Sequence, residues 1–474
     1  MPFQNTKIIA TVGPASESYL VLKELIVKGV DLFRLNFSHG THEQHAQVIK
    51  HIIQINEELG THAGIMADLQ GPKLRIGQIK DNSLVLKAGD IVTFKDEECL
   101  GTMEQVYMSY DHFARDVKPG EKILVDDGKL VFEVVETNLK DTVKLKTLYG
   151  GVLSSNKGVN LPDTQISLPS LTEKDLKDLA FILTQPVNWI ALSFVRKPEE
   201  VEDLIQKIAA ANHTAKVISK IEKPEAIRNI DAIIKVSNAV MVARGDLGVE
   251  IPIEKLPAMQ KMIINKCIQR SRPVIVATQL MDSMIKNPSP TRAEVTDVAN
   301  AVLDGTDALM LSAETSVGDH PVLVVQAMQK IISEAEKHFS PLRKKPKPSN
   351  KSTTFASDVV CFNAAKTAEE INAKAIVGLT VSGFTAFRIS SYRTPCPIFI
   401  FSSARYMLGT LSLVWGVSCY FYDENHTTDE TIEDTVNILL KHGKIHKGDY
   451  IVNTGSMPVH KKLRTNMLKV TLVE

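Results

Sequence analysis

Charged side chains stand at the ends of several short apolar runs in this sequence. In "KVISKIE", Lys220 and Glu222 are two residues apart, so both would point to one face of a strand. Glu222 and the Asp246 of "AVMVARGD" could together hold one Mg²⁺ or Mn²⁺, because Mg²⁺ keeps few protein ligands and takes the rest from water and a phosphorylated substrate. Arg34, Arg75 and Lys220 would supply the positive charge that a transferring phosphoryl group needs. This combination predicts metal-assisted chemistry on a small phosphorylated anion.

The other runs add further polar candidates, and each has a plainer reading. His39 would be either a catalytic base or a loop histidine that caps backbone groups. Thr278 would either pass a proton or use its hydroxyl to hydrogen-bond the backbone at a strand end. A mutually paired ion network closing one end of a barrel is the alternative for the whole set. The motifs of P-loop enzymes and protein kinases do not occur, so phosphate transfer would use another design. The remaining candidates are Thr11, Pro14, Asn36, Ser38, Asp68, Lys73, Ser312 and Glu314.

Eight near-continuous apolar runs, typical of parallel strands buried on both faces, alternate with amphipathic helical stretches. This alternation predicts a (β/α)8 barrel, in which such strand-end residues would meet at one face. An open doubly wound sheet is the alternative. The predicted strands are Lys7–Val12, Leu32–Asn36, Ala63–Leu69, Trp189–Phe194, Lys216–Glu222, Ala239–Asp246, Pro273–Gln279 and Ala308–Glu314.

Two further regions differ from the barrel pattern. Residues 72–168 alternate apolar and polar residues between Gly and Asp-Asp-Gly turns, which predicts a small β-barrel domain inserted as a lid. A segment rich in Pro, Lys and Ser after His338 reads as a linker, and residues 341–474 then form a separate α/β domain. The catalytic barrel would therefore comprise residues 1–71 and 169–340.

The composition excludes several classes of protein. The chain has 474 residues, and Lys plus Arg equals Asp plus Glu at 55 each, so no net charge favours nucleic acid. The cysteine count is odd and no Cys-x-x-Cys occurs, which predicts neither a disulfide framework nor a zinc site and fits a reducing cytoplasm. No secretory signal or membrane-spanning run is present. We expect a cytoplasmic protein with no nucleic acid or membrane partner.

Several long motifs resemble those of the pyruvate kinases, in order from Lys7 to the C-terminus. They include "RLNFSHGTH", "LQGPKLRIG", "GVNLP", "SKIEKPEAIRNID", "MVARGDLGVEIP" and "PSPTRAEVTDVANAVLDGTDALMLSAETSVGDHP". The resemblance implies transfer of the phosphoryl group of phosphoenolpyruvate to ADP, which gives pyruvate and ATP. It also implies Mg²⁺ (or Mn²⁺) as cofactor and a homotetramer.

The resemblance assigns roles to individual residues. Glu222 and Asp246 would bind Mg²⁺, and Lys220 would stabilise the transferring phosphoryl group and the enolate. Positions that match catalytic residues are Lys220, Thr278, Arg34, Ser312 and Glu314. Positions that match substrate-binding residues are Arg34, Lys220, Ala243, Arg244, Gly245, Asp246 and Thr278. Positions that match nucleotide-binding residues are Thr11, Pro14, Arg34, Asn36, His39, Arg75 and Lys157.

The chain departs from many family members at the position that binds a monovalent cation. Members that need K⁺ carry Glu where this chain has Lys73, and Thr-Lys where it has Leu69-Gln70. A lysine ammonium supplies the positive charge that K⁺ would bring, so the chain resembles the K⁺-independent branch. In the alternative, Lys73 merely pairs with Asp68 at the lid hinge. The position itself would be formed by Asn36, Ser38, Asp68 and Leu69.

The C-terminal domain resembles the effector domain of the family. "TVSGFTAFRIS" follows a predicted strand and opens a helix, where hydroxyls and amides would meet a phosphate. Phe384 stands where some members have a base, and a second basic cluster is limited to Lys461, Lys462 and Arg464. We therefore favour a sugar monophosphate or AMP over fructose 1,6-bisphosphate; an unoccupied structural domain is the alternative. The effector residues would be Thr380, Ser382, Gly383 and Thr385.

The sequence leaves two rival functions open. A metal-dependent aldolase or lyase acting on a pyruvate enolate would need neither the lid nor the nucleotide arginines. A non-catalytic ligand sensor would be expected to have lost Lys220, Glu222, Asp246 or Thr278, and all four are present.

Overall fold

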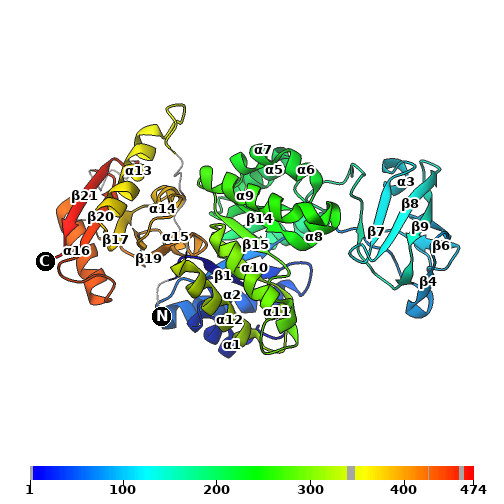
Figure 1. Ribbon diagram of the computed structural model, residues 1–474, viewed down its shortest axis with the longest axis horizontal. Helices are drawn as coiled ribbons and strands as arrows, with labels where there is room; N and C mark the ends of the chain where they lie inside the picture. The colour runs from blue at the N-terminus through cyan, green and yellow to red at the C-terminus, as the bar shows by residue number, and fades with distance from the viewer. Residues whose placement is uncertain (1–3, 339–346, 425, 458–463) are drawn as a thin grey trace.

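The computed structural model describes residues 4–338, 347–424, 426–457 and 464–474. Three bodies lie roughly in a row in Figure 1, with the C-terminal domain at one end, the barrel in the middle and the inserted β domain at the other end. The predicted boundary between residues 340 and 341 lies outside the described residues. Among the described residues, no helix is both long and apolar enough to cross a membrane.

The eight predicted strands close into a parallel barrel in the order β1-β16-β15-β14-β13-β12-β3-β2, which confirms the barrel over an open sheet. Side chains such as Met66, Trp189 and Ile218 fill its interior, and a second apolar layer packs the strands against the surrounding helices. The strands are β1 (Lys7–Thr11), β2 (Leu32–Asn36), β3 (Gly64–Asp68), β12 (Trp189–Leu192), β13 (Lys216–Ile221), β14 (Ala239–Ala243), β15 (Val274–Ala277) and β16 (Ala308–Leu311).

The surrounding helices alternate with the strands, as the sequence predicted. Thr172 and Thr291 cap their helices through capping boxes. The helical stretch after Lys223 is divided into two helices, which meet at Asn229. Seven of the eight barrel strands end earlier than predicted. The difference is three residues at β14 and β16, because helices α8 (Arg244–Glu250) and α11 (Ala313–Ser316) begin almost at once after them. The main helices are α1 (Tyr19–Val27), α2 (His42–Leu59), α4 (Glu173–Ile182), α5 (Pro198–Ala210), α6 (Pro224–Arg228), α7 (Ile230–Val236), α9 (Leu256–Gln269), α10 (Arg292–Leu303) and α12 (Pro321–Lys337).

The inserted domain is a curled β structure with its own apolar core. Its six-stranded sheet has the order β11-β7-β8-β9-β5-β6, and β4 pairs with β10 beside it. The pairing is antiparallel as predicted, except that β5 and β6 run parallel. Asp126 and Asp127 have left-handed backbone angles in the predicted turn. The strands are β4 (Leu84–Leu86), β5 (Ile91–Lys95), β6 (Gln105–Tyr107), β7 (Lys122–Val125), β8 (Leu130–Thr137), β9 (Thr142–Tyr149), β10 (Gly151–Leu153) and β11 (Val159–Asn160).

The C-terminal domain is a five-stranded sheet in the order β19-β18-β17-β20-β21, in which only β21 runs antiparallel to its neighbour among the described strands. The chain starts at β17, continues to one side through β18 and β19, and then returns to the other side at β20. The elements are α13 (Phe355–Glu370), β17 (Ala375–Leu379), α14 (Phe384–Ser390), β18 (Ile398–Ser402), α15 (Arg405–Leu411), β19 (Val417–Phe421), α16 (Thr428–Lys441), β20 (Tyr450–Gly455) and β21 (Met467–Leu472).

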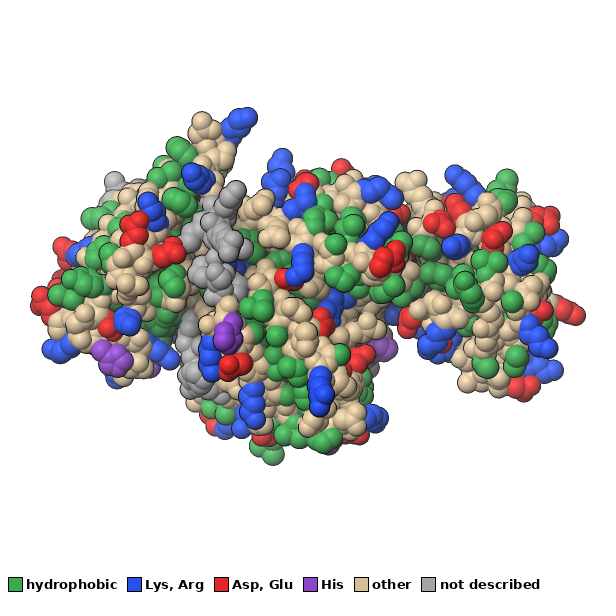
Figure 2. Space-filling view, viewed as in Figure 1, with side chains coloured by type: hydrophobic (Ala, Val, Ile, Leu, Met, Phe, Trp, Pro, Cys, Tyr) green, Lys and Arg blue, Asp and Glu red, His purple; other side chains and the backbone are tan. Residues whose placement is uncertain are grey.

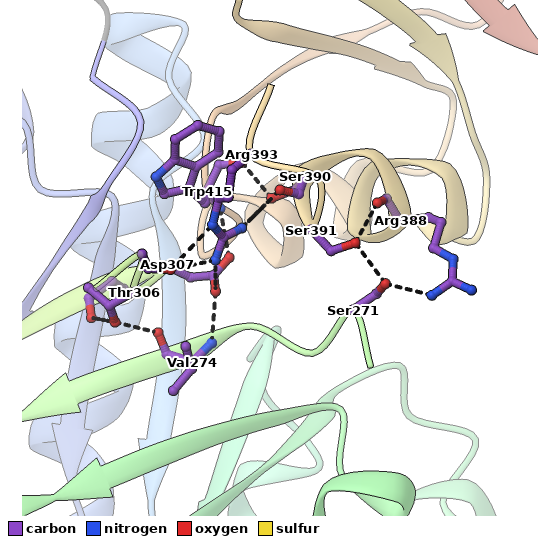
Figure 3. Close-up of polar contacts among 11 residues, drawn as sticks. Ser271, Val274, Thr306, Asp307, Arg388, Ser390, Ser391, Arg393 and Trp415 are labelled. Atoms are coloured by element: carbon purple, nitrogen blue, oxygen red, sulfur yellow. Dashed lines mark hydrogen bonds and ion pairs between the residues drawn. The ribbon is translucent and has the colours of Figure 1, made fainter. Parts of the chain in front are cut away.

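A buried ion pair joins the C-terminal domain to the base of the barrel, the end at which its strands begin (Figure 3). Arg393 donates to Asp307 and to the carbonyls of Gly305 and Ser390, at 2.8–2.9 Å for its best contacts, and its guanidinium lies 5.0 Å from the Trp415 ring. Asp307 also accepts from the backbone N–H groups of Val274 and Trp415. We call these residues the base cluster; every donor nitrogen of Arg393 has a partner.

The distribution of charge on the surface is as even as the balanced composition predicts. Lys and Arg side chains are interspersed with Asp and Glu over the face shown in Figure 2, and no single sign dominates it. The five cysteines, all of which lie within the described residues, form no disulfide with one another.

Candidate active site

Lys220 lies at the centre of a charged group in the barrel mouth, the face at which the strands end. Its Nζ is 3.0 Å from Glu222 Oε1 and 3.3 Å from Asp68 Oδ1, and it donates to Ser193 Oγ at 2.7 Å. The Lys220 side chain is only 12 % exposed. Burial favours the neutral amine, but the charges of Asp68 and Glu222 outweigh it and raise the pKa of Lys220. The ammonium is therefore a fixed positive charge at the mouth.

Arg34 extends this group toward β1. Its Nε lies 2.7 Å from Asp68 Oδ2, and its Nη1 donates to Thr11 Oγ1 at 3.1 Å. Burial opposes ionisation of Asp68, but Lys220 and Arg34 outweigh it and lower the pKa of that carboxyl. Asp68 Oδ1 nevertheless receives no hydrogen bond, although Lys220 Nζ is within ion-pair distance. The structure thus brings together three strand-end charges that the sequence singled out.

Glu222 directly follows β13, and Asp246 lies in the first turn of α8, which follows the neighbouring strand β14. Glu222 is 1 % exposed, and its Oε2 accepts a hydrogen bond from Phe194 N at 2.7 Å. Its pKa is raised by burial and further by the charge of Asp246, against the effect of Lys220. Among the described residues, no group of three or more acids, histidines and cysteines gathers as a metal cage. Two carboxylates fit an ion such as Mg²⁺ that takes its remaining ligands from water and substrate.

Thr278 follows β15 in a strained conformation. The φ angle of Thr278 is +69°, which is rare for a β-branched residue, and the φ angle of the following Gln279 is +52°. Thr278 Oγ1 accepts from Gly245 N at 2.7 Å, so the two predicted carboxylate-binding segments meet. The Arg244 side chain donates to the carbonyls of Thr278 and Gln279. Its guanidinium is in turn held by Asp297 at 2.8 Å, so Arg244 supports the strained loop.

Ser312 and Glu314 lie at the start of α11. Glu314 is fully buried and accepts from the N–H groups of Ser312 and Met281, and burial raises its pKa. It therefore positions backbone beside β16. Ser312 Oγ is buried and makes no hydrogen bond.

The predicted nucleotide-binding residues are divided between two bodies. Thr11 is in the Arg34 group described above, whereas Pro14 and His39 are exposed, and the His39 carbonyl receives a hydrogen bond from His45. In the inserted domain, Arg75 donates to the Asn156 carbonyl, and Lys157 pairs with Asp126 at 2.9 Å. No hydrogen bond or ion pair of the described residues joins Arg75 or Lys157 to the Lys220 group.

Lys73 is exposed and lines a crevice of about 40 Å³ that also contacts Asp246 and Asn160. Within the described chain it makes no ion pair with Asp68, whose partners are Arg34 and Lys220. At the predicted cation position, Asn36 Oδ1 accepts from Ser38 N, and the Leu69 carbonyl accepts from Ser193 Oγ.

The sequence reasoning missed several supporting residues. Glu250 accepts from Asn160 at 2.7 Å and from Lys223 at 2.5 Å, so it ties the inserted domain to the barrel mouth. Ser193 orients Lys220, and Asp297 holds Arg244. Each partner is distant in sequence. Lys223, Glu250 and Asp297 lie within the matched motifs, but nothing in those motifs indicates which residue each one contacts.

Comparison with known proteins agrees with this architecture. A family model described as the pyruvate kinase barrel domain matches residues 3–325, and one described as the pyruvate kinase alpha/beta domain matches residues 358–471. The chain belongs to the pyruvate kinase family. Its activity is that of the family, in which the phosphoryl group of phosphoenolpyruvate passes to ADP to give pyruvate and ATP.

Individual relatives align over their whole length. The pyruvate kinase of Corynebacterium glutamicum is 41% identical over 99% of this chain and 98% of its own length. That of Clostridium acetobutylicum is 41% identical over 99% of this chain and 100% of its own length. The crystal structure of a pyruvate kinase from Cryptosporidium parvum superposes with a TM-score of 0.92 at 34% identity and covers 99% of this chain and 96% of that one.

Proposed function

We propose that the barrel mouth carries out this phosphoryl transfer, with Lys220 as the residue that stabilises the transferring group. The observation that carries the assignment is the position of the Lys220 ammonium, 3.0 Å from Glu222 at the end of β13. A fixed cation beside a metal-binding carboxylate is arranged for negative charge that develops in the transition state. Arg34 adds a second cation on the nucleotide side, where Thr11 holds it.

Glu222 and Asp246 would hold the Mg²⁺, or Mn²⁺, of this reaction. When bound, the ion would supply positive charge that stabilises the transferring phosphoryl group. The backbone from Ala243 to Gly245 and the Thr278 hydroxyl would receive the substrate carboxylate. Thr278 also lies on the path by which the enolate carbon would gain a proton, with Ser312 nearby as a partner for water.

The inserted domain would close over the mouth as a lid. Arg75 and Lys157 would then reach the nucleotide phosphates, and closure would exclude water from the phosphoryl group. The bond from Asn160 to Glu250 supports this role, because it already links the two bodies at the mouth. An assay that couples pyruvate to lactate dehydrogenase tests the function: ADP-dependent pyruvate formation is expected, and pyruvate release without ADP would contradict it.

We further propose that turnover does not require K⁺. Lys73 is exposed on the hinge side of the crevice that contacts Asp246, where its charge would act as K⁺ does in other members. Activity in tetramethylammonium chloride should equal that in KCl at matched ionic strength. Lys73→Glu should then create a dependence on K⁺. A large activation of the unmodified chain by K⁺ would contradict the proposal.

The C-terminal domain would bind a phosphorylated activator, with a sugar monophosphate or AMP favoured over fructose 1,6-bisphosphate. A cavity of about 730 Å³ lies at the carboxyl ends of β17, β18 and β20 and includes Thr380, Ser382 and Thr385. The strand order reverses between the parallel neighbours β17 and β20, and open α/β sheets bind ligands at such a switch point. We call this the effector cavity. Gly383 N donates to Thr380 Oγ1, and Thr385 Oγ1 is bonded to Thr465.

The basic residues support the choice of a monophosphate. Arg464 is the cation that lines the effector cavity among the described residues, while Asp423 and Glu424 line it as well. Lys461 and Lys462 lie outside the described residues. Titration of each compound at low phosphoenolpyruvate tests the proposal, and activation by the bisphosphate alone would refute it. By family analogy we also propose a cytoplasmic homotetramer, which sedimentation velocity would test.

A further inference from the structure

A second cavity, separate from the active site, lies between the base of the barrel and the C-terminal domain. Its volume is about 420 Å³, and the barrel contributes Lys216, Arg270 and Arg272 while the C-terminal domain contributes Arg388, Ser352 and Thr354. We call it the basic cavity. Lys216 opens β13, and Arg272 lies just before β15, so both stand at the opposite end of the barrel from Lys220. Substrate chemistry at the mouth does not account for them.

The charges in the basic cavity are not balanced. Among the described residues, four cationic side chains line it, against the one carboxylate of Asp358. Asp358 is already engaged, because Arg388 Nη2 lies 2.7 Å from it. Arg388 Nη1 donates to Ser271 Oγ, on the side of the helix away from the base cluster in Figure 3. Its Nε is buried without a hydrogen bond.

Lys216 shows the imbalance most clearly. Within the described residues its ammonium makes no ion pair. The Lys216 Nζ lies 5.9 Å from the centroid of the Phe387 ring, in a cation–π contact. Burial and the nearby Arg272 lower the pKa of Lys216. Burial also lowers the pKa of Arg272, and Arg270 and Arg388 add to that effect. Holding these cations together costs free energy, which a bound anion would recover.

We propose that the basic cavity binds a small phosphorylated metabolite that bridges the two domains. Arginine and lysine are the side chains that recognise a phosphate group. The hydroxyls of Ser352 and Thr354 donate to Asp358, and their oxygens can still accept from hydroxyl groups of the organic part. The cavity volume suits a molecule the size of a sugar monophosphate. This site is distinct from the effector cavity, although Thr354, Ser382 and Phe384 line both, so the two ligands would lie on either side of the start of α14.

Isothermal titration calorimetry on the full chain tests the proposal, with inorganic phosphate, ribose 5-phosphate and glucose 6-phosphate as probes and the free sugars as controls. Lys216→Gln and Arg270→Gln should each weaken binding of a sugar phosphate about tenfold or more, since each removes a charged hydrogen-bond donor. Lys235→Gln changes the same charge on exposed α7 outside the cavity and should bind normally. Arg464→Gln, in the effector cavity, should leave this site within about twofold of the unmodified chain.

Basal kcat of the Lys216 and Arg270 variants should match that of the unmodified chain, because neither residue contacts the mouth. Their Tm should be no lower, because each substitution removes a charge from a crowded group of cations. The proposal is overturned if both variants bind like the unmodified chain, if Arg464→Gln alone loses binding, or if none of the probes binds. Inorganic phosphate that binds as tightly as the esters would overturn the assignment to a phosphorylated metabolite.

Discussion

The two ends of the barrel both bury a cation against a carboxylate, but they differ in how completely those charges are satisfied. At the base, Arg393 is 1 % exposed and uses all its donor nitrogens, and Asp307 accepts from Arg393 and from two backbone groups. At the mouth, Asp68 Oδ1 and Ser312 Oγ are buried without hydrogen bonds, and Thr278 has φ of +69°.

This contrast separates charges that hold the fold together from charges that await a ligand. A fully paired cluster such as that of Arg393 leaves nothing for another molecule to bind. Strained backbone and unpaired polar atoms persist only where the surrounding structure imposes them, and they gather at functional sites. The degree of satisfaction, and not the burial of charge alone, therefore distinguishes the Lys220 group at the mouth from the base cluster.

The largest effect on stability should come from the base cluster. Arg393→Met would leave Asp307 buried without its cation, and we expect the free energy of unfolding to fall by roughly 3–5 kcal/mol. Denaturant unfolding would measure this loss. Lys337→Met, which removes an exposed partner of Glu334, is the matched control and should change stability by less than about 1 kcal/mol. If Arg393→Met were as stable as Lys337→Met, the base cluster would not stabilise the fold, and its contrast with the Lys220 group would be wrong.

A somewhat smaller effect should come from the metal carboxylate at the mouth. Glu222→Gln keeps the side-chain shape but removes the charge, so we expect kcat/KM to fall on the order of a hundredfold and the Mg²⁺ requirement to rise. A titration of activity with Mg²⁺ measures both. Glu250→Gln, a neighbouring buried acid that contacts Lys223, should leave the Mg²⁺ requirement unchanged. If activity depended on the Mg²⁺ concentration in the same way in Glu222→Gln and in the unmodified chain, the assignment of Glu222 as a metal ligand would be contradicted.

The smallest effect should come from a residue that supports the strained loop. Asp297 holds Arg244, which in turn holds the carbonyls of Thr278 and Gln279. Asp297→Asn should lower kcat by about tenfold through misplacement of the Thr278 hydroxyl, with KM for ADP nearly unchanged. Asp297→Glu, which keeps the charge, should recover part of the loss. A stability loss with normal kcat per folded molecule would instead assign Asp297 a purely structural role.

Much of the fold followed from local pattern, because buried parallel strands are continuous apolar runs and their ends carry the polar residues. Lys220 and Glu222 could be placed on one face of β13 from their spacing alone. The carboxyl ends of the predicted strands were wrong where α8 and α11 begin. Ala243, which precedes α8, is not a capping residue type, and Ser312, which precedes α11, forms no side-chain cap. The left-handed turn at Thr278 was also hidden, because Arg244 and Asp297, 53 residues apart in sequence, impose it.

The base of the barrel was the least predictable region. Asp307 and Arg393 are 86 residues apart and belong to different domains, so neither motif indicates the other. The basic cavity could not be predicted for the same reason, since Lys216 and Arg388 come together only when the two domains pack. Sequence patterns report which residues end a strand, whereas pairing between domains depends on the assembled structure.

The most direct test compares Lys220→Met with Arg393→Met, each of which removes a buried cation. The measurement is pyruvate formation from phosphoenolpyruvate and ADP per folded molecule, with the folded fraction taken from unfolding curves. We expect kcat to fall on the order of a thousandfold for Lys220→Met, because the transferring group loses its cation, and to stay within about threefold for Arg393→Met. Phosphoryl transfer that survives intact in Lys220→Met would contradict the assignment of the barrel mouth as the active site.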